Sequence, residues 1–189
     1  MTLPKGYEHK ENIQNLLKFS AVKLDYNLPT LIKSENESVF GSLREIGNFR
    51  IKKMELRDRN RSIILTLDKQ SGYLLILKSD NSTLGMIRKK GYFSKKKITM
   101  KSEDGEIMLH SRRIPTNQFE ILDKNNQPKA VCTFQDVSLL NKYGHYTNTQ
   151  KFDFEILDEL FDRIVLLSFF MGIFFYMKGS LYVNDGLDF

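Results

Sequence analysis

The hydrophobic pattern of the chain is of two kinds, and one of them occurs only once. The stretch Leu160–Lys178, LFDRIVLLSFFMGIFFYMK, is apolar on every side when it is wound as a helix. A helix without a polar face must be buried completely, in protein or in lipid. Elsewhere the chain has short apolar or alternating runs separated by Asp, Asn and Gly, which is typical of antiparallel strands joined by tight turns.

The strand-like runs follow one another without any helix-length pattern between them. Asp104-Gly105 is a strong hairpin signal. Closing such a meander into a barrel removes its exposed edges and gives an apolar helix a place at the centre. We therefore predict a mainly β (α+β) fold, a closed antiparallel β-barrel around a buried hydrophobic C-terminal helix. The predicted strands are Leu16–Leu24, Gly47–Leu56 (with Phe49 and Ile51 on one face), Ser62–Leu67, Tyr73–Lys78, Thr83–Arg88, Ile98–Lys101, Glu106–His110, Phe119–Leu122, Ala130–Gln135 and a strand with Phe152, Phe154 and Ile156 inward.

The apolar stretch is short for a membrane span. Ile164–Met177 contains fourteen residues without a charge, which give a helix of about 21 Å against a hydrocarbon core of about 30 Å. Extension to Leu160 would place Asp162 and Arg163 in lipid at a high cost. The pattern favours a helix buried in protein, with a membrane span or a pair of aromatic-rich strands as alternatives.

The sequence at both ends of this stretch fits a helix. Asp158 and Glu159 are expected in its first turn, where carboxylates meet the positive end of the helix dipole. Lys178 is expected in the last turn, with Gly179 in the position after the helix that favours glycine.

Length and composition indicate one domain. The 189 residues are 41% hydrophobic and 28% charged, as in an ordinary soluble globular protein. We expect a flexible segment at 1–12, barrel strands over 15–157, the helix at 158–178 and a tail at 179–189. The N-terminus has no apolar signal region, and a lone cysteine, Cys132, fits a reducing compartment. We expect a cytoplasmic protein, with membrane association as an open alternative.

The net charge of +6 belongs to one segment. Residues 85–115 contain nine basic and three acidic residues, so the rest of the chain is neutral overall. Two basic triplets flank Gly91-Tyr92-Phe93-Ser94, an expected hairpin tip. Basic groups at an anionic membrane contribute about 1 kcal/mol each, while an aromatic ring could enter the interface. The candidate binding residues are Arg88, Lys89, Lys90, Tyr92, Phe93, Lys95, Lys96, Lys97, Arg112 and Arg113.

The same basic segment is compatible with two further roles. A lysine-rich loop also protects a sheet edge from aggregation. Basic residues with aromatic rings can bind nucleic acid, but this segment offers a single aromatic pair and no helix-turn-helix or RNP-like motif. Nucleic acid therefore ranks below a membrane surface, and a protein partner remains open.

Catalytic and metal-binding patterns are absent from the sequence. His9, His110 and His145 have no metal-ligand spacing, no G-x-S-x-G motif or glycine-rich phosphate loop occurs, and Cys132 lies in an apolar run. An acidic cluster precedes the apolar stretch, but apolar residues interrupt it and it lacks the glycine of a calcium loop. We expect no enzyme activity, cofactor or metal. The cluster consists of Asp153, Glu155, Asp158, Glu159 and Asp162.

The order of these features resembles a known superfamily. Hairpins such as Phe119–Phe134, FEILDKNNQPKAVCTF, an acidic lead-in and a terminal hydrophobic helix are similar to the tubby C-terminal-like superfamily, especially LURP-one-related and phospholipid-scramblase-like proteins. The resemblance covers about residues 15–178 and implies a barrel of twelve strands threaded by the helix. It departs from the scramblases in lacking a cysteine cluster and a proline-rich N-terminal region, and the tail Ser180–Phe189 runs past the helix.

The resemblance also implies a function. Tubby-like domains bind phosphoinositides through surface lysines and arginines, so we expect a peripheral binder of anionic lipid. A scramblase-like membrane protein anchored by Leu160–Lys178 is the first alternative. A protein- or nucleic-acid-interaction domain is the second.

Overall fold

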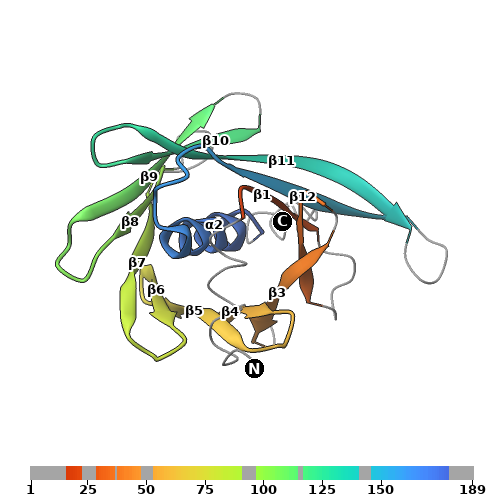
Figure 1. The fold of residues 1–189 in the computed structure, drawn as a ribbon, viewed down its shortest axis with the longest axis horizontal. Coiled ribbons are helices and arrows are strands. Elements are labelled where there is room, and N and C mark those ends of the chain that lie inside the picture. The colour runs from red at the N-terminus through yellow and green to blue at the C-terminus, as the bar shows by residue number, and fades with distance from the viewer. Residues whose placement is uncertain are drawn as a thin grey trace, which may run out of the picture.

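The computed structural model describes residues 16–22, 29–36, 38–47, 53–90, 97–114, 117–140 and 146–178. Twelve antiparallel strands form a closed barrel in the order β1-β12-β11-β10-β9-β8-β7-β6-β5-β4-β3-β2 (Figure 1). The elements are β1 (Lys18–Val22), β2 (Thr30–Ser34), β3 (Val39–Ile46), β4 (Lys53–Asp58), β5 (Ile63–Gln70), β6 (Tyr73–Lys78), β7 (Thr83–Lys90), β8 (Lys97–Lys101), β9 (Ile107–Ile114), β10 (Gln118–Asp123), β11 (Pro128–Leu140), β12 (Tyr146–Ile156) and α2 (Arg163–Lys178).

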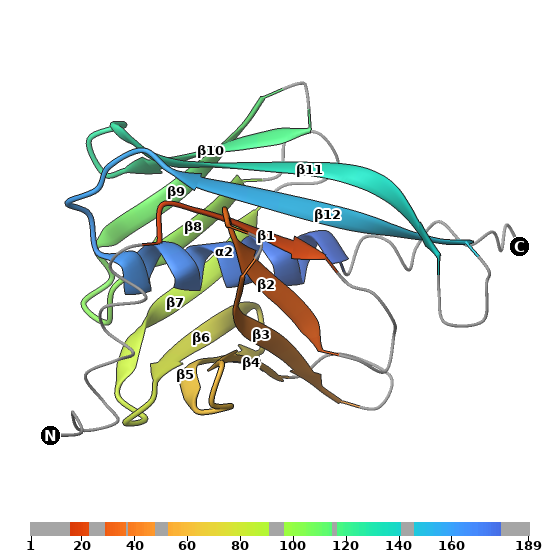
Figure 2. The same ribbon diagram turned by 45° about the vertical axis from the view of Figure 1, so that its right-hand side comes forward.

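The helix α2 runs through the middle of the barrel, as Figure 2 shows. Every residue from Val165 to Phe175 is buried, because each side of the helix meets inward-facing side chains of the strands. The Phe170 ring lies 4.8 Å from the ring of Phe19 and 5.4 Å from that of Phe154, measured between centroids. The predicted barrel around a buried helix is confirmed. Within the described residues, no helix has both the length and the hydrophobicity needed to cross a membrane.

The predicted start of the helix is wrong. The helix begins at Arg163, and its first turn contains no acidic residue. Asp162 precedes it as the N-cap, with its Oδ1 accepting hydrogen bonds from the backbone N–H of Ile164 (2.8 Å) and Val165 (3.4 Å). Leu160, expected to be buried, is 97% exposed. Asp158 and Glu159, predicted in the first turn, belong to the non-helical segment that leads into the helix, because the helix starts only after Asp162.

Four hairpin turns share one backbone pattern at the end of the barrel where α2 begins. In one of them, Lys78 N donates to Ser82 O (2.9 Å) and Asn81 N donates to Lys78 O (3.0 Å). The fourth residue of each turn has a positive φ, which favours glycine and asparagine. The same bonds recur at 58–62, 102–106 and 123–127, and the positive-φ residues are Arg61, Asn81, Gly105 and Asn126. The predicted Asp/Asn/Gly turns are confirmed.

The strand boundaries differ from prediction in three places. The strands β2 and β3 are not among the predicted ones, because their sequences, TLIKS and VFGSLREI, show little alternation of apolar and polar residues. The strand predicted from Gly47 begins at Lys53, and Phe49 and Ile51 lie outside the described residues, as do 1–12 and 179–189. The hairpin of β11 and β12 is longer than predicted, and it extends past the barrel (Figures 1 and 2).

Candidate functional site

The described part of the predicted basic site lies on β7, β8 and β9. The segment 91–96, which includes Tyr92, Phe93, Lys95 and Lys96, falls outside the described residues. The remaining predicted residues are on strands, where successive side chains point to opposite faces of the sheet. A run of basic residues in the sequence is therefore divided between the outside and the inside of the barrel.

Strand β7 divides the first basic triplet. Ile87 is buried in the core, so Arg88 and Lys90 face outward and Lys89 faces inward. Arg88 and Lys90 are exposed and Lys89 is half-buried. The Arg88 guanidinium lies over the ring of Tyr73, with its Cζ 5.6 Å from the ring centroid.

Strand β8 adds two outward-facing lysines beside these residues. Ile98 and Met100 are buried, so Lys97 and Lys101 face outward with Arg88 and Lys90. We name these four outward residues, Arg88, Lys90, Lys97 and Lys101, the basic strip. Lys101 is not among the predicted binding residues, although strand alternation from Lys97 points to it.

The basic strip contains a cross-strand pair of like charges. Lys90 of β7 is the direct Cα partner of Lys97 of β8. Like charges at directly opposite positions destabilise a sheet. Among the described residues, Lys90, Lys97 and Lys101 form no ion pair with an acidic residue. The strip therefore keeps its positive charge on the surface and has the capacity to bind an anion.

The neighbouring strand β9 borders the basic strip but adds little free positive charge to it. Partial burial lowers the pKa of His110, and the charges of Lys97 and Arg112 act in the same direction. Arg112 itself is neutralised, because it pairs with Glu120 of β10 through two nitrogens, one of them Nε at 2.7 Å. Of the two predicted arginines on β9, Arg112 thus lies at the border of the strip and already binds the carboxylate of Glu120.

Lys89 and Arg113 lie on the inner face of the barrel, and Lys89 is near the end of the helix. Lys89 Nζ is 5.5 Å from the ring centroid of Tyr176, in the last turn of α2, where the negative end of the helix dipole favours a cation. Burial raises the pKa of the Tyr176 phenol, and its hydroxyl is 3.3 Å from Ile87 O. Arg113 is the cross-strand partner of the buried Phe119. These two basic residues are placed to support the barrel interior rather than the strip.

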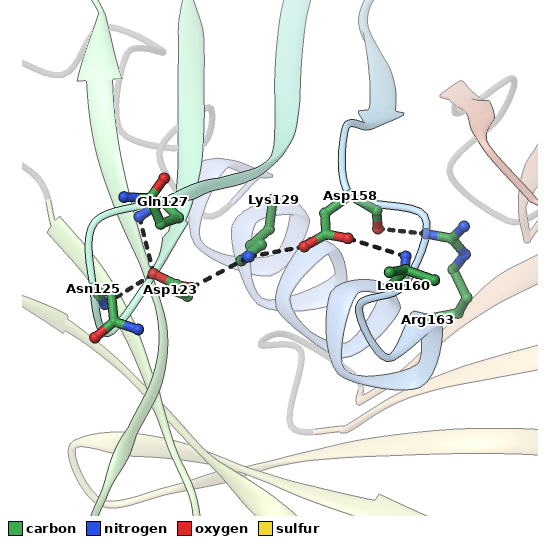
Figure 3. Close-up of polar contacts among 7 residues, drawn as sticks. All are labelled: Asp123, Asn125, Gln127, Lys129, Asp158, Leu160 and Arg163. Atoms are coloured by element: carbon green, nitrogen blue, oxygen red, sulfur yellow. Dashed lines mark hydrogen bonds and ion pairs between the residues drawn. The ribbon is translucent and has the colours of Figure 1, made fainter.

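A polar cluster fixes the segment before the helix at the other end of the barrel (Figure 3). Lys129 Nζ lies 2.8 Å from Asp158 Oδ2 and 3.3 Å from Asp123 Oδ2, with its side chain only 14% exposed. Asp158 O accepts a hydrogen bond from Arg163 Nη1 at 3.0 Å, and Asp158 Oδ1 accepts one from Leu160 N. The cluster joins the β10–β11 hairpin to the start of α2.

The charges in this cluster favour its ionised form. The hydrogen bond from Lys129 holds the pKa of Asp158 below its usual range, and the same bond raises the pKa of Lys129. Burial tends to raise the pKa of Asp123, but hydrogen bonds from Gln127 and Asn125 N–H, together with Lys129, lower it overall. A carboxyl with a lowered pKa in the folded state stabilises folding at neutral pH and loses that contribution in acid.

We expect replacement of Lys129 by methionine to lower the melting temperature at pH 7. The wild-type contribution of Asp158 should be full above the pKa of an unfolded aspartate, about 3.9, and should disappear as the pH falls through its lower folded pKa. Lys129 contributes below its unfolded pKa and loses that contribution only in strong base. The variant should therefore lose less stability between pH 5 and pH 2 than the wild type does, as measured by thermal unfolding across this range.

Lys124→Met is the matched control, since Lys124 is exposed in the turn of the same hairpin. It removes one lysine without breaking the cluster and should keep the wild-type pH dependence. An identical acid profile for Lys129→Met and wild type would contradict the proposed coupling.

The acidic residues expected before the helix do not gather into a metal site. Asp153 and Glu155 pair with Lys151 and Lys18, each at 3.0 Å, on the outer face of β12. Within the described residues, no group of three or more His, Cys, Asp or Glu side chains could hold a metal ion. Phe152 and Phe154 are buried as predicted.

The thiol of Cys132 has no features of a nucleophile. It is buried in the barrel core, and burial raises the pKa of the thiol well above its ordinary value. The thiolate that would react is therefore strongly disfavoured.

A groove of about 260 Å³ lies on the outside of β1, β11 and β12. Four of its charged lining residues form the ion pairs Lys18–Glu155 and Lys151–Asp153, and Glu35 is a further acidic residue of the lining. Because two lysines stand against three acidic residues in the lining, this groove has no net attraction for an anion. The basic strip remains the best candidate site.

Comparisons with known proteins find a similarity of fold. No protein-family model matches the chain, and no curated protein matches it either. The X-ray structure of a protein from Arabidopsis thaliana is similar with a TM-score of 0.53 and 9% sequence identity, covering 87% of this chain and 91% of that one. At this identity the similarity concerns the fold alone.

Proposed function

We propose that the chain is a non-enzymatic, tubby-like module related to the LURP-one proteins, which binds anionic lipid or phosphoinositide at a membrane surface through the basic strip. The observation that carries this proposal is the placement of Lys90 directly opposite Lys97. Such a pair costs stability in the free protein, and a bound phosphate would relieve the repulsion.

The barrel supports this role by holding the strip in a fixed arrangement. Arg88, Lys90, Lys97 and Lys101 are on paired strands, so their spacing changes little on binding. Ammonium and guanidinium groups bind phosphate oxygens by charge-assisted hydrogen bonds. At about 1 kcal/mol for each basic residue near an anionic surface, four residues support reversible docking, to which we propose that Tyr92 or Phe93 adds shallow insertion.

The architecture agrees with the proposed relationship. A closed barrel around a buried helix is what the tubby-like resemblance implies, and the similar fold of the Arabidopsis protein supports it. We propose a cytoplasmic protein that associates with membranes peripherally, with the helix remaining inside the barrel.

The test is co-sedimentation with vesicles of neutral lipid, or of neutral lipid mixed with phosphatidylserine or a phosphoinositide. We expect binding to the anionic vesicles alone, reversed by high salt because exposed charges are screened. Lys90→Glu combined with Lys97→Glu should weaken the binding by about 30-fold or more, since two lost contacts of ~1 kcal/mol each cost ~2 kcal/mol.

Lys78→Glu combined with Lys124→Glu is the control with the same change of net charge. Both lysines are exposed, in or beside turns at the end of the barrel opposite to the Lys90–Lys97 pair. Equal weakening by both double variants would mean that net charge, and not the strip, determines binding. Binding to single-stranded oligonucleotide that outcompetes the vesicles would instead favour a nucleic-acid-interaction domain.

A further inference from the structure

The β11–β12 hairpin continues past the barrel as a two-stranded arm (Figures 1 and 2). Strand β10 pairs with β11 only as far as Thr133, and β1 pairs with β12 only as far as Lys151. The two long strands remain paired with each other beyond these points. We name this extension, residues 136–140 of β11 and 146–150 of β12, the arm.

Within the described residues, the β12 side of the arm is an open backbone edge. At the barrel end of β12, Ile156 N donates a hydrogen bond to Leu17 O (2.8 Å) on this same side of the strand. The direction of N–H and C=O alternates along an antiparallel strand, so Gln150, Asn148 and Tyr146 direct theirs to this side as well. Strand β1 ends before it reaches them, and in the described part of the chain no other strand pairs with this edge.

In the part of the chain that the structure describes, this edge has none of the usual protection. The five residues Tyr146–Gln150, YTNTQ, contain no charge and no proline, and the β11–β12 register has no bulge. Natural proteins protect open edges with lysine, proline, bulges or a covering segment. A hairpin of two strands alone is also only marginally stable. Both facts favour the addition of another strand.

We propose that a second copy of this chain supplies that strand. Tyr146–Gln150 of the two copies pair antiparallel about a two-fold axis at Asn148. The same edge then serves both copies, so the interface is isologous and closes at a dimer. Because the edge is neutral, no like charges meet across the axis. A charged partner would find no complementary group on it.

The distribution of charge over the barrel also favours self-pairing. The excess of basic residues lies on β7, β8 and β9, and the two strands β10 and β11 separate β12 from β9, the nearest of the three. The edge therefore lies away from the part of the molecule that would repel a second copy. Dimers formed in this way keep both basic strips open, so dimerisation goes beyond the proposed lipid binding and does not depend on it.

Sedimentation velocity of the full chain over a wide concentration range tests the proposal. We expect a reversible dimer of twice the 22.1 kDa chain mass. Asn148→Pro removes one N–H from the open edge and should give a monomer. Ser138→Pro is the matched control, because Ser138 is the cross-strand partner of Asn148 and its N–H points to the opposite edge of the arm; this variant should remain dimeric.

A cysteine at the axis gives an independent readout. In the proposed dimer the two copies of residue 148 form a cross-strand pair with Cα atoms about 5.5 Å apart, within the range of a disulfide. Mild oxidation of Asn148→Cys should therefore give a covalent dimer, and Ser138→Cys should give far less. A monomer at all concentrations, a dimer that survives Asn148→Pro, or equal crosslinking of the two cysteine variants would overturn the proposal.

Discussion

Replacing Gly172 with glutamate is expected to abolish folding of the barrel. Gly172 lies in the buried part of α2, and a Cβ atom there would be 2.6 Å from Ile87 Cδ1 and 3.1 Å from Ile87 Cγ2. Overpacking of this kind costs about 1–3 kcal/mol, and a carboxylate buried without a partner costs several kcal/mol more. Together they approach the ~5–15 kcal/mol that stabilises a typical domain.

The measurement is the yield of folded protein, followed by circular dichroism and thermal unfolding. Gly172→Ala is the control, since one methyl group requires only a small shift of Ile87, and this variant should fold. A Gly172→Glu variant that melts like wild type would show that α2 does not occupy the centre of the barrel.

Replacing Phe170 with alanine should lower the free energy of unfolding by about 3–5 kcal/mol. The Phe170 side chain is fully buried, and its ring packs against rings from β1 and β12 as well as from α2 itself. The centroid distances are 4.8 Å to Phe19, 5.4 Å to Phe154 and 6.1 Å to Phe174. Removal of the ring leaves a cavity where the helix joins the two strands that close the barrel.

Urea denaturation would give this change in free energy, with Phe175→Ala as the matched control. Phe175 lies in the same helix but is 8% exposed, and its ring lies 5.8 Å from that of its neighbour Tyr176, between centroids. We expect a clearly smaller loss for this variant. Equal losses at both positions would contradict a core centred on Phe170.

The basic residues show that side chains adjacent in the sequence point to opposite faces when they lie on a strand. In the sequence, Arg88, Lys89 and Lys90 form one triplet, which predicts that all three bind together. On β7 the middle lysine faces the interior and contacts Tyr176, while the other two face outward. Side-chain alternation separates these three residues only if the strand continues to Lys90. The sequence pattern predicts that the strand ends at Arg88, so it does not predict the separation.

The start of the helix shows a second limit of local pattern. Apolar residues from Leu160 onward suggest an early start, and the preceding acids suggest a charged first turn. The structure instead uses Asp158 to bind Lys129 of a hairpin 29 residues earlier, and Asp162 caps the helix. A contact at this separation is not visible in a local window of sequence.

The sequence by itself determined the turns, most of the strands and the burial of α2. Each of these depends on short-range rules, namely the left-handed backbone of Asn and Gly in turns, the alternation of strand side chains, and the lack of any polar face on Leu166–Phe175. Tertiary structure decided which basic residues share the outer face, where the helix begins, and how far β11 and β12 extend beyond their neighbours. Those features follow from strand register and from the pairing of β1 with β12, which bring together residues distant in the sequence, so that local pattern could not specify them.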